Sequence, residues 1–212
     1  LTTGDFNTAI GRSSQADVTT SEKNTTVGYF AGRKLAVGGS SNTALGYYAL
    51  GKATTGTYNI AIGDTALGDA TLTGSYNIGI GRNALINATS ASKNIAIGAG
   101  VLSSATTTTT QNVGIGHRSL FVATGNSNTA IGYYAGKSIT TGTNNLAMGE
   151  NAGKGTTTGV GNVSVGYYTL SNATTTSYNT AIGYTALRLN STGQQNTANG
   201  AQALDSNTTG NY

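Results

Sequence analysis

The 212-residue sequence contains no cysteine, no proline and no tryptophan, and only 8% of its residues are charged. Without cysteine, the chain can form neither a disulfide framework nor a cysteine-based metal site. The charged share is about a third of the usual value for soluble proteins. No apolar run approaches the roughly 18 residues needed to cross a bilayer, so the sequence predicts no direct insertion into a membrane.

Groups that carry chemistry are also scarce. The 11 basic residues are scattered along the chain, whereas nucleic-acid binding needs them on one face, so no nucleic-acid partner is predicted. The single histidine, His117, stands in a position that other repeats fill with Tyr, Arg, Asp, Glu or Ala, which indicates a surface position. Calcium-binding β-rolls need an aspartate at a fixed place in every repeat. The sequence therefore predicts no enzyme, no cofactor and no metal site.

A short motif recurs throughout the chain. It reads NTALGYYAL at 42–50, NTAIGYYAG at 128–136 and NTAIGYTAL at 179–187. We number each repeat from its first asparagine, the anchor, as position 0. The anchors follow one another at intervals of 16 to 18 residues, and a glycine always stands at position +4. The anchors are Asn7, Asn24, Asn42, Asn59, Asn77, Asn94, Asn112, Asn128, Asn145, Asn162, Asn179 and Asn196.

Between anchor and glycine the residues alternate with period two, which predicts a strand. Position +3 is Ile, Val, Leu or Met in every repeat except at Asn199, and position +2 is small. We expect the β-branched face to form one buried stack, composed of Ile10, Ile62, Ile80, Ile97, Ile115, Ile131 and Ile182. We expect the small face to pack against another chain, through Ala9, Ala44, Ala61, Ala130 and Ala181.

Other repeated positions predict the return path and the turns. Position +8 is usually leucine, a second core contact: Leu50, Leu67, Leu85, Leu102, Leu120, Leu170, Leu187 and Leu204. A second glycine often precedes the next anchor by three residues, where a turn with φ > 0 is expected: Gly4, Gly39, Gly56, Gly74, Gly125, Gly142, Gly159 and Gly193. Two interpretations of the anchor stay open, an in-register amide ladder or a turn residue that tolerates the left-handed region.

A repeat of about 17 residues is too short for a pair of helices and suits one coil of a solenoid. The sequence therefore predicts an all-β fold, a parallel β-solenoid or β-roll of about twelve coils. At about 4.8 Å a coil, the rod would be roughly 55 Å long. Both ends of the chain are in phase with the repeat, so we expect residues 1–212 to be a single array cut from a longer fibre protein. So thin a rod buries little core, which favours a homotrimer.

The unit N-[TIV]-A-I-G-x-x-A-L…T-T-G resembles the repeats in the heads of trimeric autotransporter adhesins. It also resembles repeats of phage-tail-fibre-like proteins that often end in an endosialidase-type chaperone domain. The resemblance covers essentially the whole chain and implies a left-handed parallel β-roll with three chains side by side. Because the adhesin unit has about 14 residues, an intertwined triple-stranded β-helix remains an alternative.

Tyrosines supply the one candidate binding surface. They occupy positions +5 and +6 after the invariant glycine in several repeats, so they should form a stripe along the coils. As ligand-binding candidates we take Tyr29, Tyr47, Tyr48, Tyr133, Tyr134, Tyr167 and Tyr168. The alternative is a purely structural aromatic ladder that packs against the next chain.

The predicted function is that of a structural and adhesive segment of a homotrimeric surface fibre, extracellular, on a bacterial cell or a virion. Its expected partners are its own copies and a host-cell or prey surface receptor or glycan, bound by this segment or an adjacent domain. The alternative is an ice- or crystal-binding β-solenoid. Threonine runs at 106–110, 156–158 and 174–176 favour that alternative, but most repeats lack a Thr-x-Thr sequence there.

Overall fold

A computed structural model describes residues 4–35, 38–104 and 108–211, and the only regular elements in these ranges are three-residue strands. The chain divides into two compact units, residues 1–110 and 111–212, which we describe separately. Unit 1 contains β1 (Thr8–Ile10), β2 (Thr25–Val27), β3 (Thr43–Leu45), β4 (Ile60–Ile62), β5 (Ile78–Ile80) and β6 (Ile95–Ile97). Unit 2 contains β7 (Val113–Ile115), β8 (Thr129–Ile131), β9 (Leu146–Met148), β10 (Val163–Val165), β11 (Thr180–Ile182) and β12 (Thr197–Asn199).

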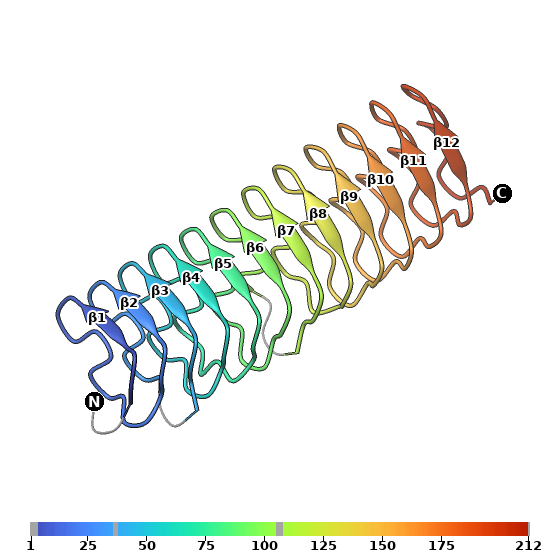
Figure 1. The fold of residues 1–212 in the computed structure, drawn as a ribbon. Coiled ribbons are helices and arrows are strands. Elements are labelled where there is room, and N and C mark those ends of the chain that lie inside the picture. Colours follow the sequence, from blue (N-terminus) through green and yellow to red (C-terminus); the bar gives the residue numbers. More distant parts are fainter. Residues whose placement is uncertain (1–3, 36–37, 105–107, 212) are drawn as a thin grey trace. The chain divides into compact units, whose positions relative to one another are not determined.

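Within each unit, each strand pairs in parallel with the strand of the next repeat, and equivalent positions lie opposite each other. Ile60 thus pairs with Ile78 and Ile78 with Ile95, while Val163 pairs with Thr180 in unit 2. Figure 1 shows these strands following one another in sequence order within each unit. The predicted parallel β-solenoid is confirmed, with each coil closed by a single chain. The single array over both units and its length stay predictions.

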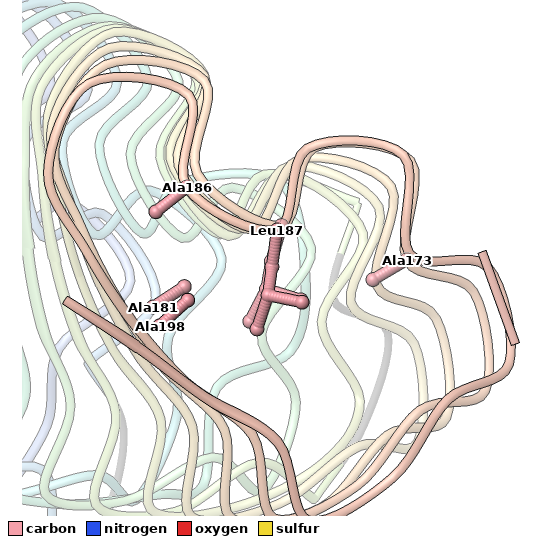
Figure 2. Packing of buried hydrophobic residues seen from close by; sticks show 6 residues of the cluster. Ala173, Ala181, Ala186, Leu187 and Ala198 are labelled. Atoms are coloured by element: carbon pink, nitrogen blue, oxygen red, sulfur yellow. The ribbon is translucent and has the colours of Figure 1, made fainter. Parts of the chain in front are cut away.

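The interior of each coil is lined by the small face of the strand. Ala61, Ala130 and Ala181 are completely buried, at the middle position of β4, β8 and β11. Leucines at position +8 fill the space between the strand and the returning chain. Figure 2 shows this arrangement in unit 2, where Leu187 lies between the alanines of two strands, Ala181 and Ala198, and the return segment. The predicted leucine contact is confirmed, although Leu204 in the last repeat is 49% exposed.

The predicted orientation of the strands was therefore wrong. The isoleucine stack lies on the outer face: Ile10 and Ile182 are 58% and 39% exposed, and Ile62, Ile80, Ile97, Ile115 and Ile131 are half-buried. The alanines expected at a chain–chain contact, Ala44, Ala61, Ala130 and Ala181, are instead inside the coil, and Ala9 is exposed in β1. The cause is the narrow coil: a Cβ added at Gly79 would already lie 3.3 Å from the Leu67 side chain, so the interior has no room for a branched residue at position +2.

The two glycine positions have different causes. Gly132, at position +4, has a φ of 135°, and a Cβ there would lie 2.5 Å from the Gly149 carbonyl oxygen of the next coil. The turn glycine Gly142 has no positive φ, but a Cβ there would lie 2.5 Å from the Gly159 oxygen. The predicted φ > 0 was wrong for the whole turn set: Gly4, Gly39, Gly56, Gly74, Gly125, Gly142, Gly159 and Gly193. Close approach of the next coil, rather than turn conformation, favours glycine there.

The anchor asparagines form the expected amide ladder. In unit 2, the Asn162 backbone N–H and Nδ2 donate to Asn145 Oδ1 at 3.0 and 3.1 Å. Asn145 Nδ2 in turn donates to Asn128 Oδ1 at 3.1 Å and to the Gly159 carbonyl at 2.8 Å. The left-handed conformation falls on the residue before the anchor, for example Asn144 at φ 58°, and not on the anchor itself. Each anchor thus satisfies buried backbone groups of its own coil and the next.

Candidate ligand-binding surface

The predicted tyrosines lie on the outside of the coils, just after the strand. Position +5 points into solvent, as at Tyr47 and Tyr133, which are 54% and 47% exposed. Position +6 is half-buried and adopts the left-handed region, with φ of 57°, 55° and 54° at Tyr48, Tyr134 and Tyr168. Because this backbone conformation is disfavoured for bulky residues, the coil must hold these rings in place.

In unit 1 the structure brings three of the predicted residues together. The rings of Tyr29 and Tyr47 stack at 5.4 Å and 7°, and Tyr48 lies beside Tyr47 at 6.0 Å. Phe30, which the prediction omitted, contacts Tyr29 at 4.1 Å and meets Tyr48 edge-on at 5.8 Å. The next coil has Asp64 at position +5, so this aromatic group covers two coils only.

In unit 2 the predicted residues form two groups instead of one stripe. Tyr133 and Tyr134 lie 4.2 Å apart, and Tyr167 and Tyr168 lie 4.5 Å apart. Glu150 occupies position +5 in the coil between them. Each group extends by one more ring at position +5: His117 stacks on Tyr133 at 5.6 Å and 15°, and Tyr184 stacks on Tyr167 at 5.3 Å and 6°.

Tyr134 has the most unusual electrostatic surroundings. Lys137 Nζ lies 4.5 Å and Lys154 Nζ 5.9 Å from the centre of its ring. A hydrogen bond from the Tyr133 hydroxyl, followed by one from Arg118, lowers the pKa of Tyr134 below its ordinary value. The same bond to Tyr134 raises the pKa of Tyr133, because it stabilises the protonated donor. Three cations therefore surround one half-buried phenol.

Other cations at comparable positions are paired with a carboxylate on a neighbouring coil. Arg188 Nε donates to Asp205 Oδ1 at 2.8 Å, and its Nη2 donates to Asp205 Oδ2 at 3.0 Å. In unit 1, Arg33 pairs with Asp17 at 3.0 Å, and Lys52 pairs with Asp69 at 3.4 Å. In the ranges that the structure describes, Arg118, Lys137 and Lys154 form no such ion pair.

The structure assembles no cluster of acid–base groups around the single histidine. His117 is exposed and its contacts are the rings of Tyr133 and Tyr134. Asp64 accepts a hydrogen bond from the Thr65 hydroxyl at 2.8 Å, while Asp69 faces Lys52. Across residues 4–35, 38–104 and 108–211, no group of three His, Asp or Glu side chains could hold a metal ion, and no helix could cross a membrane.

Threonines of unit 2 form a column that the sequence analysis had undervalued. The hydroxyl of Thr140 donates to the Thr157 carbonyl at 3.1 Å, that of Thr157 to the Thr174 carbonyl at 2.9 Å, and that of Thr174 to the Ser191 carbonyl at 3.2 Å. A second, exposed column follows one residue later: Thr141, Thr158, Thr175, Thr192 and Thr209. Part of the run at 106–110 lies outside the described residues.

The outer face of the strands is apolar. Positions +1 and +3 of β4, β5 and β6 are all isoleucine: Ile60, Ile62, Ile78, Ile80, Ile95 and Ile97. The equivalent positions of β7 to β11 are Val, Ile, Thr, Leu and Met, and no charged residue stands at either position in any of the strands described. Each of these side chains is half-buried or exposed.

Comparison with known proteins identifies no relative. No family model, no curated protein and no solved structure matches the chain. Its function must therefore be argued from its own surfaces.

Sequence reasoning missed four members of the surface around Tyr134: His117 as a stacking ring, Arg118, Lys137 and Lys154. The signal was present in the repeat numbering. Lys137 and Lys154 share position +9 in consecutive repeats, and Arg118 and Tyr134 share position +6. Because equivalent positions stack in a solenoid, aligning the repeats by position would have placed these residues side by side.

Proposed function

We propose that this chain is a structural and adhesive segment of a homotrimeric surface fibre, exposed outside a bacterial cell or on a virion. The observation that carries the proposal is the uncharged apolar outer face of the strands. Soluble monomers rarely expose contiguous apolar patches of more than a few hundred Å². A face that repeats in every coil suits a partner with the same repeat, namely another copy of the chain.

Three copies around a common axis would cover this face along each unit. Closed cyclic symmetry is the usual arrangement of identical chains. The resemblance of the repeat to trimeric adhesin heads and tail-fibre-like proteins supports a trimer over a dimer. In this arrangement the outer isoleucines form the contact between chains, and the interior alanines do not take part.

The mass of the particle in solution tests the proposal. We expect light scattering to give three times the 21.2 kDa of the chain. The double variant I80S/I97S should dissociate the trimer, because it places hydroxyls in the apolar contact. The matched control is Ile86→Ser, a half-buried isoleucine outside the strands, which should leave the mass unchanged. A wild-type monomer would reject the trimeric fibre.

Binding to an ice or crystal surface is a second candidate, favoured by the threonine columns of unit 2. The hydroxyls of the inner column are held by hydrogen bonds to the next coil, so the array is ordered before it meets a lattice. If this function is correct, the chain shows thermal hysteresis in freezing solution, and T158Y/T175Y abolishes it. Thr55→Tyr, at an exposed turn of unit 1, is the control. Wild-type protein without hysteresis would reject ice binding.

A further inference from the structure

We propose that the surface around Tyr134 binds an acidic polysaccharide, a sugar polymer that carries carboxylate or sulfate groups. We call this surface the basic aromatic patch and define it by Arg118, Tyr133, Tyr134, Lys137 and Lys154. The inference rests on the proposed adhesive function and names a ligand class for it.

The patch is built from three consecutive coils of unit 2. Arg118 belongs to the coil of β7, Tyr134 and Lys137 to the coil of β8, and Lys154 to the coil of β9. At about 4.8 Å a coil, its outer cations are separated by about 10 Å along the stack. Both lysine ammonium groups approach the same ring, at 4.5 and 5.9 Å, and Arg118 donates to the hydroxyl of that ring. The three cations thus converge on one point of the surface.

The patch lacks the carboxylate that balances charge elsewhere. At position +9, Arg188 is matched by Asp205 in the following coil. Lys137 has the same position, but the residue at position +9 in the following coil is Lys154. Like charges that face each other on adjacent strands are destabilising. An oxyanion between the two ammonium groups would remove this repulsion and form charge-assisted hydrogen bonds.

One carboxylate lies at the edge of the patch and does not neutralise it. Glu150 accepts a hydrogen bond from Asn151 Nδ2 at 3.3 Å, and its charge contributes to raising the pKa of Tyr133. It forms no ion pair with a cation of the patch within the described residues. Three cations against one carboxylate leave the patch positive.

The aromatic rings favour a sugar over a nucleic acid. Tyr133 is 47% exposed and stacks on His117, so an apolar face with a polar edge lies next to the cations. Such amphipathic rings suit the C–H faces and hydroxyls of a saccharide. A nucleic acid needs a longer row of cations. Here position +9 continues with Ser171 and then with the already paired Arg188, so the patch ends after about 10 Å.

Binding of defined polymers to the full chain tests the inference. The probes are polygalacturonate for carboxylate, dextran sulfate for sulfate, and uncharged dextran and single-stranded DNA as comparisons. We expect one or both acidic polysaccharides to bind, and their relative affinities identify the preferred group. The double variant K137Q/K154Q should weaken binding about tenfold, and added salt should weaken it as well. Tyr133→Leu should weaken it without changing the charge.

The control is K34Q/K93Q, which removes two exposed lysines of unit 1 and the same amount of charge. Equal weakening by both double variants would overturn the patch, as would the failure of both acidic polysaccharides to bind. DNA binding of equal strength and equal sensitivity to K137Q/K154Q would overturn the sugar assignment. Light scattering on the same samples separates the two proposals: a trimer that binds no polysaccharide rejects the patch alone, whereas a monomer that binds rejects the trimer alone.

Discussion

Ile139 fills the interior space that Gly136 leaves open three residues earlier in the same coil. Ile139 is 1% exposed, and a Cβ added at Gly136 would lie 3.0 Å from its Cδ1 atom. In the preceding coil the two positions are exchanged in size, with Leu120 at position +8 and Ala123 at position +11, both buried. One large and one small side chain thus fill the coil in either order.

The same exchange predicts a coupled response to mutation at these two positions. Gly136→Leu alone should overpack the coil and cost about 1–3 kcal/mol, and Ile139→Ala alone should leave a cavity and cost about 2–5 kcal/mol. The double variant G136L/I139A recreates the arrangement of Leu120 and Ala123 and should recover most of both losses. Urea unfolding of all four proteins gives the coupling energy. Additive losses would show that the two positions do not share one space.

The orientation of the strands predicts opposite responses at neighbouring residues. Ala130→Leu should destabilise the coil by about 1–3 kcal/mol, because Ala130 is completely buried and the interior is full. Ile131→Ala should cost a monomeric chain less than the 2–5 kcal/mol of a buried isoleucine, because Ile131 is half-buried on the outer face. Thermal unfolding at a concentration where the chain is monomeric compares the two. A larger loss for Ile131→Ala would contradict this orientation.

The amide ladder predicts a large effect for a single buried anchor. Asn145→Ala removes the acceptor of the Asn162 backbone N–H and the donor to the Gly159 carbonyl. Each buried group left without a partner costs about 1–3 kcal/mol. Asn172→Ala, at an exposed position, is the matched control and should be close to neutral. Equal stability of the two variants in urea would argue against a stabilising ladder.

Two glycines at position +4 separate backbone strain from steric clash. Gly132 and Gly200 have similar φ, 135° and 128°, but only Gly132 has the next coil against it, with the Gly149 oxygen 2.5 Å from an added Cβ. Gly200→Ala should therefore cost only the strain, about 1–3 kcal/mol, and Gly132→Ala should cost more. Hydrogen exchange of the affected coils measures both, including local opening at the last coil. A smaller effect at Gly132 would refute the clash.

Tyr134 should be deprotonated at lower pH than its neighbour Tyr133. Its pKa is lowered by the hydrogen bonds from Tyr133 and Arg118, so its contribution to stability is present above the unfolded pKa near 10 and is lost as pH falls through the folded value. The raised pKa of Tyr133 acts in the opposite sense: its contribution is present below the unfolded pKa and is lost as pH rises through the folded value.

An NMR titration with labelled tyrosine, assigned with Y133F and Y134F, measures both pKa values. Arg118→Gln should raise the pKa of Tyr134, because one donor and a nearby positive charge are removed. An unchanged value would show that Arg118 does not reach the hydroxyl.

Much of the fold follows from the sequence alone. The regular recurrence of Asn and Gly predicts the coil, and the alternation before each glycine locates the strand, because three residues with period two can only be extended backbone. The anchor ladder and the interior leucines also follow, since equivalent positions stack when every coil has the same path. Leu187 and Asn145 lie where the repeat alone would place them.

The face of the strand that lies inside was decided only by the tertiary structure. Alternation shows that two faces differ, but it does not say which is buried. The width of the coil decides this: Leu187 from the return segment fills the interior, so only alanine fits at Ala181, and Ile182 is turned outward. The basic aromatic patch has the same origin. Arg118, Lys137 and Lys154 are 17 to 19 residues apart in sequence, and only the stacking of coils one strand spacing apart brings their charges together on one surface.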